Sequence, residues 1–394
     1  MIARLIPALL IAAIFVTPAR AVPIAKDTIF GVALTPANLG GGTSTDWAAS
    51  LDKAAQVGGT VMLDYTWGSN QTMSDLQQQV NLARERGLKV SIQFSSATTA
   101  VITPTGGLPP TFADPRTRIS FHLTLRQLAA MKPDSLIIMP EVNVLQKYSP
   151  AQYDLFKSFY PQAYALVKSI SPNTQTGVSY ADRLWVANNQ ASMPDELGPR
   201  DFVAFTSYLS DVFSTPSAIP QGWYSQFRTA YPNESILMSE IGWGTSGNGS
   251  LAEQANFIAA LPDLLRVADP DMVMWWMLKD PVLSLAGLTP DEIAYLESVG
   301  IDVNHLFDQF KSIGLLDVNG KVRFGWFVAL GLEFDDGGAA RVAALLPPPE
   351  SDGNAPLVLA VASEPRALGL LGFALLLLMC GRWRSTARAG YPIP

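Results

Sequence analysis

From Asp27 to about Leu345, the sequence alternates between short apolar runs and longer segments whose apolar residues recur at helical spacing. This alternation is typical of α/β folds with a parallel sheet, because strands buried on both faces read as near-continuous apolar runs. Eight such runs separated by helices predict a single (β/α)8 TIM barrel. A doubly wound open sheet is the competing fold, but no glycine-rich dinucleotide turn follows the first run. The runs are Thr28–Leu34, Gly59–Trp67, Leu88–Phe94, Leu136–Met139, Thr176–Tyr180, Asp201–Tyr208, Ile236–Ser239 and Met272–Leu278.

The intervening segments carry helix signals. The segment Met73–Arg86 is expected to end at Gly87, a helix-ending glycine. Ser149 and Pro150 offer a hydroxyl cap and a proline at the first helical position. A Pro- and Gly-rich insertion, Thr103–Pro115, is long enough to form a wall of a binding cleft. Further helical spacing is found in Trp47–Val57, in Ile119–Met131 and in the stripe Tyr153, Phe156, Tyr160, Tyr164 and Val167, which we expect to face the core.

Two of the runs stop at a carboxylate. Leu136–Met139 is followed by Glu141, and Ile236–Ser239 is followed by Glu240, 99 positions further along the chain. In a parallel barrel, the carboxyl ends of all strands meet at one mouth. Two acids at that mouth suit glycoside hydrolysis, in which one carboxyl protonates the leaving oxygen and the other attacks the sugar or activates water. A single acid after an apolar run is more often a solvated strand end, so the pair carries the hypothesis.

The other residues at the predicted strand ends are rich in amides, phenols and indoles, which is the chemistry of sugar binding. Each aromatic residue taken alone is at least as compatible with a role in the core. Trp275 and Trp276 are adjacent on one strand and must point to opposite sides, so only one of them can line the site. The strand-end set is Asp64, Trp67, Gln93, Glu141, Asn143, Tyr180, Asp182, Tyr208, Glu240, Trp243, Trp275, Trp276 and Lys279.

These residues resemble the clan A retaining glycoside hydrolases, a superfamily of TIM barrels. The stretch Ser239–Trp243 is similar to the nucleophile strand of endo-acting members such as arabinogalactan endo-galactanases, β-glucanases and mannanases, and Ser250–Ile258 resembles the helix that follows it. Gly314–Trp326 resembles the closing stretch before the last helix of the family. The resemblance covers roughly Phe30 to Leu330 and is most specific around the seventh and eighth strands.

The resemblance implies an endo-β-glycanase-like enzyme that acts by double displacement. Glu141 takes the place of the acid/base and Glu240 that of the nucleophile, with Tyr208 hydrogen-bonding the nucleophile and a tryptophan of the eighth strand beneath the cleaved sugar. Neither a metal nor an organic cofactor is implied. The substrate-binding residues expected beside the two glutamates are Trp67, Gln93, Asn143, Tyr180, Tyr208, Trp243, Trp275 and Trp276.

One position departs from the family pattern. The clan usually has an asparagine just before the acid/base, where its amide contacts the sugar 2-hydroxyl, and this chain has Pro140. Proline has no N–H donor, so that contact is missing or comes from another residue, for which Asn143 is a candidate.

The N-terminus has the pattern of a secretory signal peptide. Residues 1–21 contain an early Arg4, the apolar run Leu5–Val16 and the small-x-small sequence Ala19-Arg20-Ala21. This predicts cleavage after Ala21 and export. A membrane-spanning helix is disfavoured because the run is too short.

The C-terminus has a second apolar run, Leu368–Cys380, followed by a basic cluster that includes Arg382 and Arg384. With Glu364-Pro365 before it, this tail resembles the PEP-CTERM sorting signal of Gram-negative bacteria. The resemblance implies an exosortase-type partner, membrane contact before processing, and a final place in the periplasm, at the cell surface or in the extracellular matrix. A plain C-terminal membrane anchor is the alternative. The expected domains are therefore the signal peptide at 1–21, the catalytic domain at 22–345, a flexible linker at 346–363 and the sorting segment at 364–394.

Composition excludes several other classes. The net charge of −7 and pI near 5.0 argue against nucleic acid as a partner. The single cysteine, Cys380, lies in the tail, so the barrel has neither a disulfide nor a thiol nucleophile. His122 and His305 lack metal-ligand spacing and read as structural or solvated.

Three functions remain open at this stage. The first is an exported retaining glycosidase that acts on a β-linked polysaccharide. The second is a catalytically inactive barrel that binds polysaccharide at the cell surface, and the third is a transglycosylase that uses the same residues. Sugar identity, endo or exo action and oligomeric state lie in loop shapes that the sequence does not define.

Overall fold

The computed structural model describes residues 28–34, 44–68, 71–95, 104, 107–246, 249–281 and 303–330. The expected signal peptide, linker and sorting segment lie outside the described residues, as does part of the Thr103–Pro115 insertion. Within the described ranges, no helix has both the length and the apolar character needed to cross a membrane.

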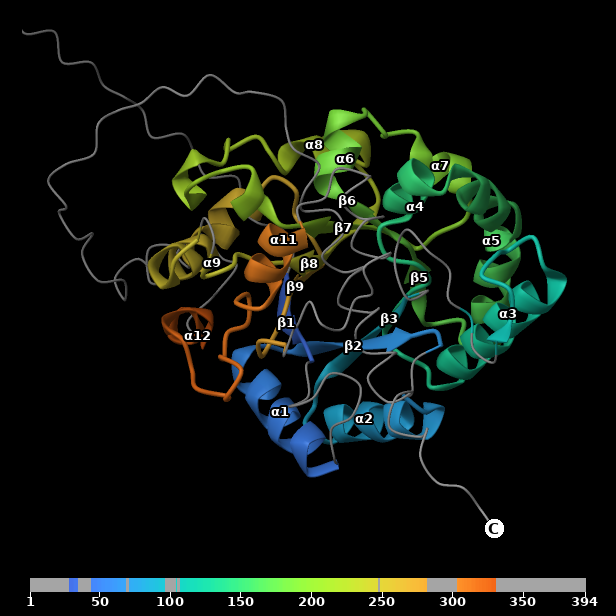
Figure 1. The fold of residues 1–394 in the computed structure, drawn as a ribbon, viewed down its shortest axis with the longest axis horizontal. Coiled ribbons are helices and arrows are strands. Elements are labelled where there is room, and N and C mark those ends of the chain that lie inside the picture. The colour runs from blue at the N-terminus through green and yellow to red at the C-terminus, as the bar shows by residue number, and fades with distance from the viewer. Residues whose placement is uncertain are drawn as a thin grey trace, which may run out of the picture.

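The described strands form one parallel α/β sheet that curls into a nearly closed barrel, the arrangement of a TIM barrel (Figure 1). Its hydrogen-bonded order is β5-β4-β3-β2-β1-β9-β8-β7-β6. β5 and β6 are separated only by Val178 and pair with β4 and β7 respectively, so together they fill one strand position. The strands are β1 (Ile29–Ala33), β2 (Thr60–Thr66), β3 (Lys89–Ser95), β4 (Ser135–Ile137), β5 (Gln175–Gly177), β6 (Ser179–Ala181), β7 (Phe202–Ser207), β8 (Ser235–Ile241) and β9 (Met272–Trp275).

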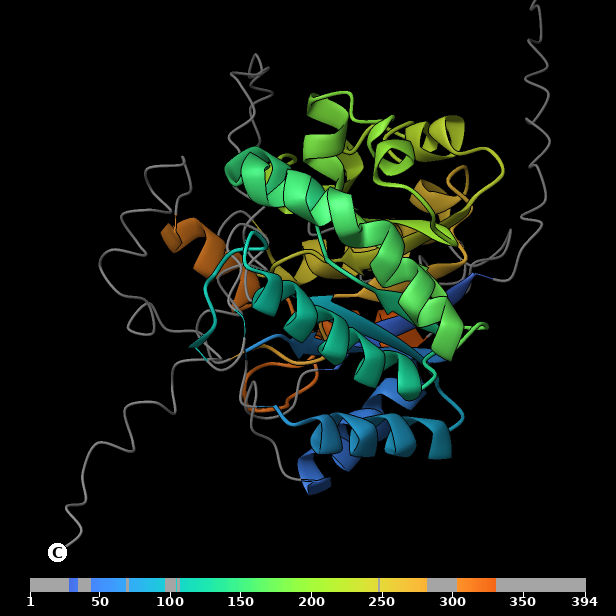
Figure 2. The same cartoon turned by 90° about the vertical axis from the view of Figure 1, so that its right-hand side faces the viewer.

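The eight predicted runs are therefore confirmed as strands, with the fifth divided in two. Helices surround the strands, and Figure 2 shows α3 and α5 side by side across the outer face. The helices described are α1 (Ser44–Val57), α2 (Met73–Glu85), α3 (Pro115–Ala130), α4 (Val142–Tyr148), α5 (Pro150–Ile170), α6 (Asp182–Ala187), α7 (Met193–Leu197), α8 (Ser225–Ala230), α9 (Leu251–Leu265), α11 (Val303–Phe310) and α12 (Phe324–Leu330), with 3-10 turns η2 (Leu209–Asp211) and η3 (Pro216–Ala218).

Local sequence explains where several helices begin and end. Thr72 and Asp75 form a reciprocal capping box at the start of α2. Asp114 caps α3, whose first residue is Pro115. Gly87 follows α2 with a φ of 73°, as expected for a residue that ends a helix in the left-handed region. The helix predicted at Ser149-Pro150 begins there, although the Ser149 side chain makes no capping hydrogen bond.

The core lies between the outer faces of the strands and the helices. One cluster joins Trp67 and Phe94 at the ends of β2 and β3 to Phe112 and to Phe121 of α3. All four side chains are fully buried. Phe159 of α5 packs against both Phe112 and Phe121. Burial of each large aromatic side chain contributes about 1.5–3 kcal/mol, so this cluster fixes α3 and α5 against the barrel.

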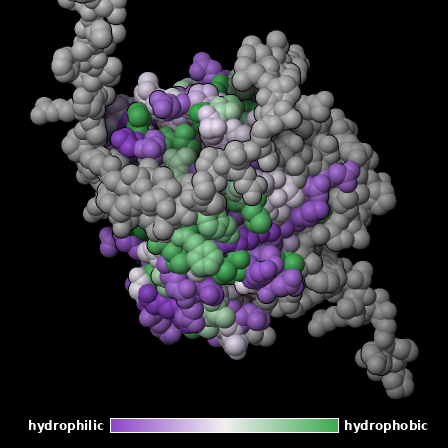
Figure 3. Space-filling view, turned by 90° about the vertical axis from the view of Figure 1, so that its left-hand side faces the viewer, coloured by the Kyte–Doolittle hydropathy of each residue, from purple (hydrophilic) through white to green (hydrophobic). Residues whose placement is uncertain are grey.

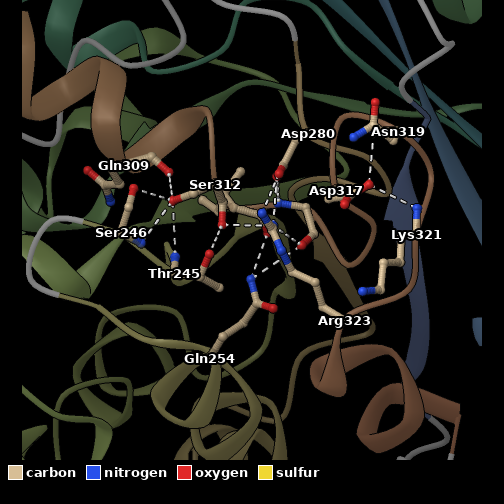
Figure 4. A network of polar contacts seen from close by, with 12 residues as sticks. Thr245, Ser246, Gln254, Asp280, Gln309, Ser312, Asp317, Asn319, Lys321 and Arg323 are labelled. Atoms are coloured by element: carbon tan, nitrogen blue, oxygen red, sulfur yellow. Dashed lines mark hydrogen bonds and ion pairs between the residues drawn. The ribbon is translucent and has the colours of Figure 1, made fainter.

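A polar network fastens the C-terminal part of the barrel (Figure 4). The Arg323 guanidinium pairs with both oxygens of Asp280 just beyond β9, and also donates to the carbonyls of Ser312 and Gly314. Gln254 of α9 donates to the Gly314 carbonyl from the other side at 3.4 Å. The segment between α11 and α12 is thereby held against the end of the sheet.

The face with α9 and α12 is shown in Figure 3, where apolar side chains gather among polar ones. The exposed apolar residues of these two helices are Leu251, Phe327 and Leu330.

Candidate active site

Glu141 follows β4 in a left-handed backbone conformation, with φ 49° and ψ 48°. This conformation is uncommon for a residue with a side chain and marks a position that its surroundings hold in place. Its N–H donates to the Ser179 hydroxyl at 3.0 Å, and its Oε1 accepts a hydrogen bond from the Thr206 hydroxyl at 2.6 Å. The side chain is 1% exposed.

Glu240 lies near the end of β8, where the strand carries one extra residue. Met238 pairs with Phe205 of β7, but the next pair along β7 is Thr206 with Glu240. The register with β9 shifts over the same interval. An extra residue of this kind is a β-bulge, which re-aims the side chains around it. Here it sets the side chain of Glu240 on the inner side, opposite Thr206.

Two neutral donors hold the Glu240 carboxylate. The Gln93 amide of β3 donates to Oε1 at 2.8 Å, and the Tyr208 hydroxyl donates to Oε2. The contact between Tyr208 and Glu240 is the one that the family resemblance implied. All three side chains are buried, so these hydrogen bonds replace the water that a carboxylate would otherwise need.

The two glutamates interact electrostatically and differ in their surroundings. Burial raises the pKa of both carboxyls. The charge of Glu240 raises the pKa of Glu141 further, whereas the hydrogen bonds from Tyr208 and Gln93 oppose the effect of burial on the pKa of Glu240. Like charges at short range do not both ionise readily. Burial raises the pKa of Glu240 to about 8, and the charge that Glu240 then carries raises the pKa of Glu141, so Glu240 loses its proton first and Glu141 keeps its proton to higher pH.

Asp64 of β2 is a third carboxyl at the site; it is half-buried and in register with Gln93 on the neighbouring strand. It accepts hydrogen bonds from Ser95 at 3.0 Å and Thr66 at 3.2 Å. Burial is the main reason that its pKa is raised to about 7. Its charge also raises the pKa of Glu240.

Asp182, at the start of α6, is a fourth carboxyl at the site, and it is buried. Its Oδ2 accepts hydrogen bonds from Ser207 at 2.6 Å and from the Trp223 indole at 3.0 Å. Burial raises its pKa, and its charge adds to the raised pKa of Glu141. Asp64 and Asp182 thus flank the glutamate pair from two sides of the barrel.

Four of the aromatic residues expected to bind substrate lie elsewhere. Trp67 packs in the aromatic cluster described above, and Tyr180 packs against Phe205 beneath the helices. Trp243 and Trp275 both contact Phe257 of α9. All four are almost completely buried on the outer side of the barrel. The structure therefore corrects the expectation that Trp67, Tyr180, Trp243 and Trp275 line the site.

Of the tryptophans expected to bind substrate, Trp276 is the one that can still face the inside of the barrel. Trp275 is the last residue of β9 and points outward to α9, and the side chain of the next residue along an extended chain points the other way. Trp276 is 3% exposed.

The expectation that Asn143 binds substrate also disagrees with the structure. Its amide exchanges two hydrogen bonds with the backbone of Ala181, at 3.0 and 2.9 Å, and donates a third to Gln190 at 3.0 Å. These bonds tie α4 to β6. The side chain therefore serves the fold and does not replace the amide that Pro140 lacks.

Sequence reasoning missed Thr206. It lies in β7, two residues before Tyr208, which directly follows the strand, and residues at that spacing share one face of an extended chain. This signal was available once Tyr208 had been assigned to the inner face. Trp223 had no such signal, because it lies in the loop before α8.

Metal binding has no visible basis here: among the described residues, no three His, Cys, Asp or Glu side chains are grouped so that they could hold an ion. His122 contacts the Arg118 carbonyl of its own helix at 2.9 Å and packs on Phe159. The side chain of His305 lies outside the described residues.

The molecule is a parallel α/β barrel with a pair of carboxyls at the carboxyl ends of its strands, and comparison with solved structures agrees on the fold. A GH5_18 protein from Streptomyces cattleya, solved with GlcNAc, has a TM-score of 0.55 and 17% identity, covering 82% of this chain and 82% of that chain. A GH5_18 variant from Bifidobacterium longum subsp. longum, solved with Manβ1-4GlcNAc, has a TM-score of 0.56 and 14% identity over 81% and 79%.

An exo-β-1,4-mannosidase from Opitutaceae bacterium strain TAV5 is similar to the same degree, with a TM-score of 0.55 and 17% identity over 82% of this chain and 60% of that chain. At these identities the likeness establishes the fold alone. No protein-family model matches the sequence, and no curated protein sequence matches it.

Proposed function

We propose that this protein is an exported retaining glycoside hydrolase that cleaves a β-linked polysaccharide, with Glu240 as nucleophile and Glu141 as acid/base. One observation carries the proposal. The two buried carboxyls at the ends of β4 and β8 interact, since the charge of Glu240 raises the pKa of Glu141. Each carboxyl accepts a hydrogen bond from a different hydroxyl, one from Thr206 of β7 and one from Tyr208, the residue directly after β7. Two carboxyls in different protonation states are what double displacement at an anomeric carbon requires.

The reaction has two steps. In the first, Glu240 attacks the anomeric carbon, the glycosidic bond breaks, and the departing oxygen takes the bonding pair and the proton of Glu141. In the second, Glu141 takes a proton from water, the water oxygen attacks the same carbon, and the Glu240 carboxylate is released. The raised pKa of Glu141 keeps its proton in place for the first step.

Neutral donors are central to this assignment. A cation on Glu240 would stabilise its charge and weaken it as a nucleophile, whereas Gln93 and Tyr208 orient the carboxylate without a full positive charge. Tyr208 is itself kept protonated, because burial and the charge of Glu240 raise its pKa well above the usual range.

The substrate is a β-linked glycan. Two of the solved structures concern β-mannosides by name, one solved with Manβ1-4GlcNAc and one called an exo-β-1,4-mannosidase. β-1,4-Mannosides are therefore the first glycans to test, followed by β-glucans and β-galactans.

The test combines two variants with a covalent label. We expect Glu240→Ala and Glu141→Ala each to lower the release of reducing ends by at least a thousandfold from the glycan that the wild type cleaves. A 2,4-dinitrophenyl 2-deoxy-2-fluoro-β-mannoside should label Glu240 in the wild type. Proton NMR of the first product should show the β anomer. An α anomer, or a label on another residue, would contradict the assignment.

One observation favours a second function, a catalytically inactive barrel that binds polysaccharide. Pro140 and the engaged Asn143 leave no amide for the sugar 2-hydroxyl at the usual place. If wild type and both variants release no reducing ends from any glycan in the panel yet bind mannan equally well, the binding function replaces the enzymatic one. Elongated products in place of hydrolysis would indicate a transglycosylase.

A further inference from the structure

Thr206 of β7 interacts with both glutamates. Its backbone pairs in register with Glu240 across the β-bulge of β8, and its hydroxyl lies 2.6 Å from Oε1 of Glu141. The residue is 1% exposed. β7 and the residue directly after it therefore supply one hydroxyl to each glutamate, Thr206 to Glu141 and Tyr208 to Glu240.

The two oxygens of the Glu141 carboxyl differ. Oε1 accepts the Thr206 hydrogen bond, while Oε2 is buried and has no hydrogen-bond partner among the described residues. A buried polar oxygen without a partner is costly. It is explained if Oε2 is the oxygen that a substrate atom approaches.

We propose that Thr206 is a positioning residue that engages Oε1 of Glu141 and so makes Oε2 the oxygen that gives and takes the proton. This inference rests on the proposed function of Glu141. An oxygen that accepts a hydrogen bond through its lone pair is the carbonyl-type oxygen of a neutral carboxyl, so the acidic proton belongs on the other one. In the first step, the Oε2–H bond breaks as the glycosidic oxygen takes the proton. In the second, Oε2 gains the proton of water.

The geometry has one competing arrangement, in which Oε1 carries the proton and donates it to the Thr206 oxygen. The two arrangements predict opposite effects. A hydroxyl that donates to the carboxylate favours the charged form, so its removal raises the pKa of Glu141. A hydroxyl that accepts from the neutral acid favours the neutral form, so its removal lowers that pKa.

Two substitutions separate the hydroxyl from the shape of the side chain. Thr206→Val is nearly isosteric and removes the hydroxyl, and Thr206→Ser keeps the hydroxyl and removes the methyl group. The charged groups that act on Glu141 are Glu240 of β8 and, in α6, Asp182 and Arg183. All three are retained in both variants.

The first measurement needs no substrate. Infrared spectra of the full-length protein are recorded as a function of pH, and the carboxyl band that is lost in Glu141→Gln is followed. We expect Thr206→Val to raise the midpoint of this band by on the order of one pH unit, and Thr206→Ser to restore the wild-type midpoint. An unchanged or lowered midpoint in Thr206→Val would overturn the proposal.

The second measurement compares leaving groups. We expect Thr206→Val to lower kcat/KM for β-1,4-mannobiose by on the order of tenfold, because the departing sugar needs a proton. The value for 2,4-dinitrophenyl β-mannoside should change little, because dinitrophenolate leaves without one. Equal losses on both substrates would show a merely structural role. If the wild type cleaves neither substrate while the infrared midpoint rises, the proposed function fails and the hydrogen-bond assignment of Thr206 stands.

Discussion

Glu141, Asp182 and Glu240 are buried and Asp64 is half-buried, and loss of hydration is the largest cause of the raised pKa in each of them. A group whose pKa is higher in the folded than in the unfolded state costs stability once the pH exceeds the unfolded value. Four such carboxyls within one barrel are a typical sign of a functional site, where stability is lower so that the chemistry can occur.

Asp64→Asn tests this cost. The pKa of Asp64 is about 7 in the folded protein, against 3.8 for the unperturbed group. The folded state therefore holds a proton that the unfolded state has lost between these values, and the destabilisation grows over that range. We expect the asparagine variant to gain on the order of 2 kcal/mol at pH 8, with Tm higher by about 5 °C, and to gain nothing near pH 3.5. Thermal unfolding at the two pH values measures this, and an equal gain at both would contradict it.

The same substitution should move the pH profile of activity. Glu240 must be ionised to attack, and its pKa is raised by burial and, to a smaller extent, by the charge of Asp64. Removing that charge lowers the pKa of Glu240, so the acidic limb of kcat/KM should shift by about half a unit to lower pH. The alkaline limb, which reports Glu141, should stay in place. A shift of the acidic limb to higher pH would mean that Asp64 supports Glu240 as a hydrogen-bonded acid and not as a charge.

At the scale of elements, the sequence predicts the strands better than the directions of their side chains. Buried parallel strands are continuous apolar runs, so their positions are visible in the sequence. The same property removes the alternation of polar and apolar residues that would reveal which face is inward. Trp67, Tyr180, Trp243 and Trp275 were therefore assigned to the site by position alone, and the structure places them outside it.

The inward direction of Glu141 and Glu240 could be predicted for a physical reason. A carboxyl can be buried only where hydrogen bonds or neighbouring charges accommodate it, and in this barrel those partners are on the inner side. The bulge in β8 had no signal in the sequence, because it depends on how Ser239 and Glu240 pair with two neighbouring strands at once. Asn143 was misassigned because its partners, Ala181 and Gln190, come from a distant segment.

The network at the end of β9 allows a prediction with an internal control. The Arg323–Asp280 pair is buried, with side-chain exposures of 13% and 3%. Arg323→Ala leaves Asp280 without its cation and also removes the donor to two carbonyls. Loss of one member of a buried pair costs about 3–5 kcal/mol, so Tm should fall by about 10 °C.

Lys311 provides the control, because its pair with Asp308 is about half exposed on both sides. We expect Lys311→Ala to change stability by less than about 1 kcal/mol. Chemical denaturation of the two variants beside the wild type gives the comparison. Equal effects would show that the network is not what fastens the segment between α11 and α12.

At the scale of the whole molecule, the fold and the proposed processing are compatible. β1 begins at Ile29, so cleavage after Ala21 would leave the first strand and its partner β9 intact. The last described helix, α12, ends at Leu330, before the linker expected at 346–363. The Lys53 ammonium of α1 lies 5.3 Å from the ring centroid of Trp326, so the first and last described helices are in contact.

Export of the whole protein can be tested through its N-terminus. We expect the protein produced in a Gram-negative host to begin at Val22 when it is recovered outside the cytoplasm, because small residues at Ala19 and Ala21 define the cleavage site. Intact-mass spectrometry of that fraction gives the N-terminus directly. Ala21→Arg should block cleavage and leave the precursor in the membrane fraction, while the nearby change Lys26→Arg, outside the cleavage signature, should leave processing unchanged. A protein that keeps Met1 and stays in the cytoplasm would remove export from the proposed function, but the chemistry assigned to Glu141 and Glu240 would be unaffected, since both lie within the barrel.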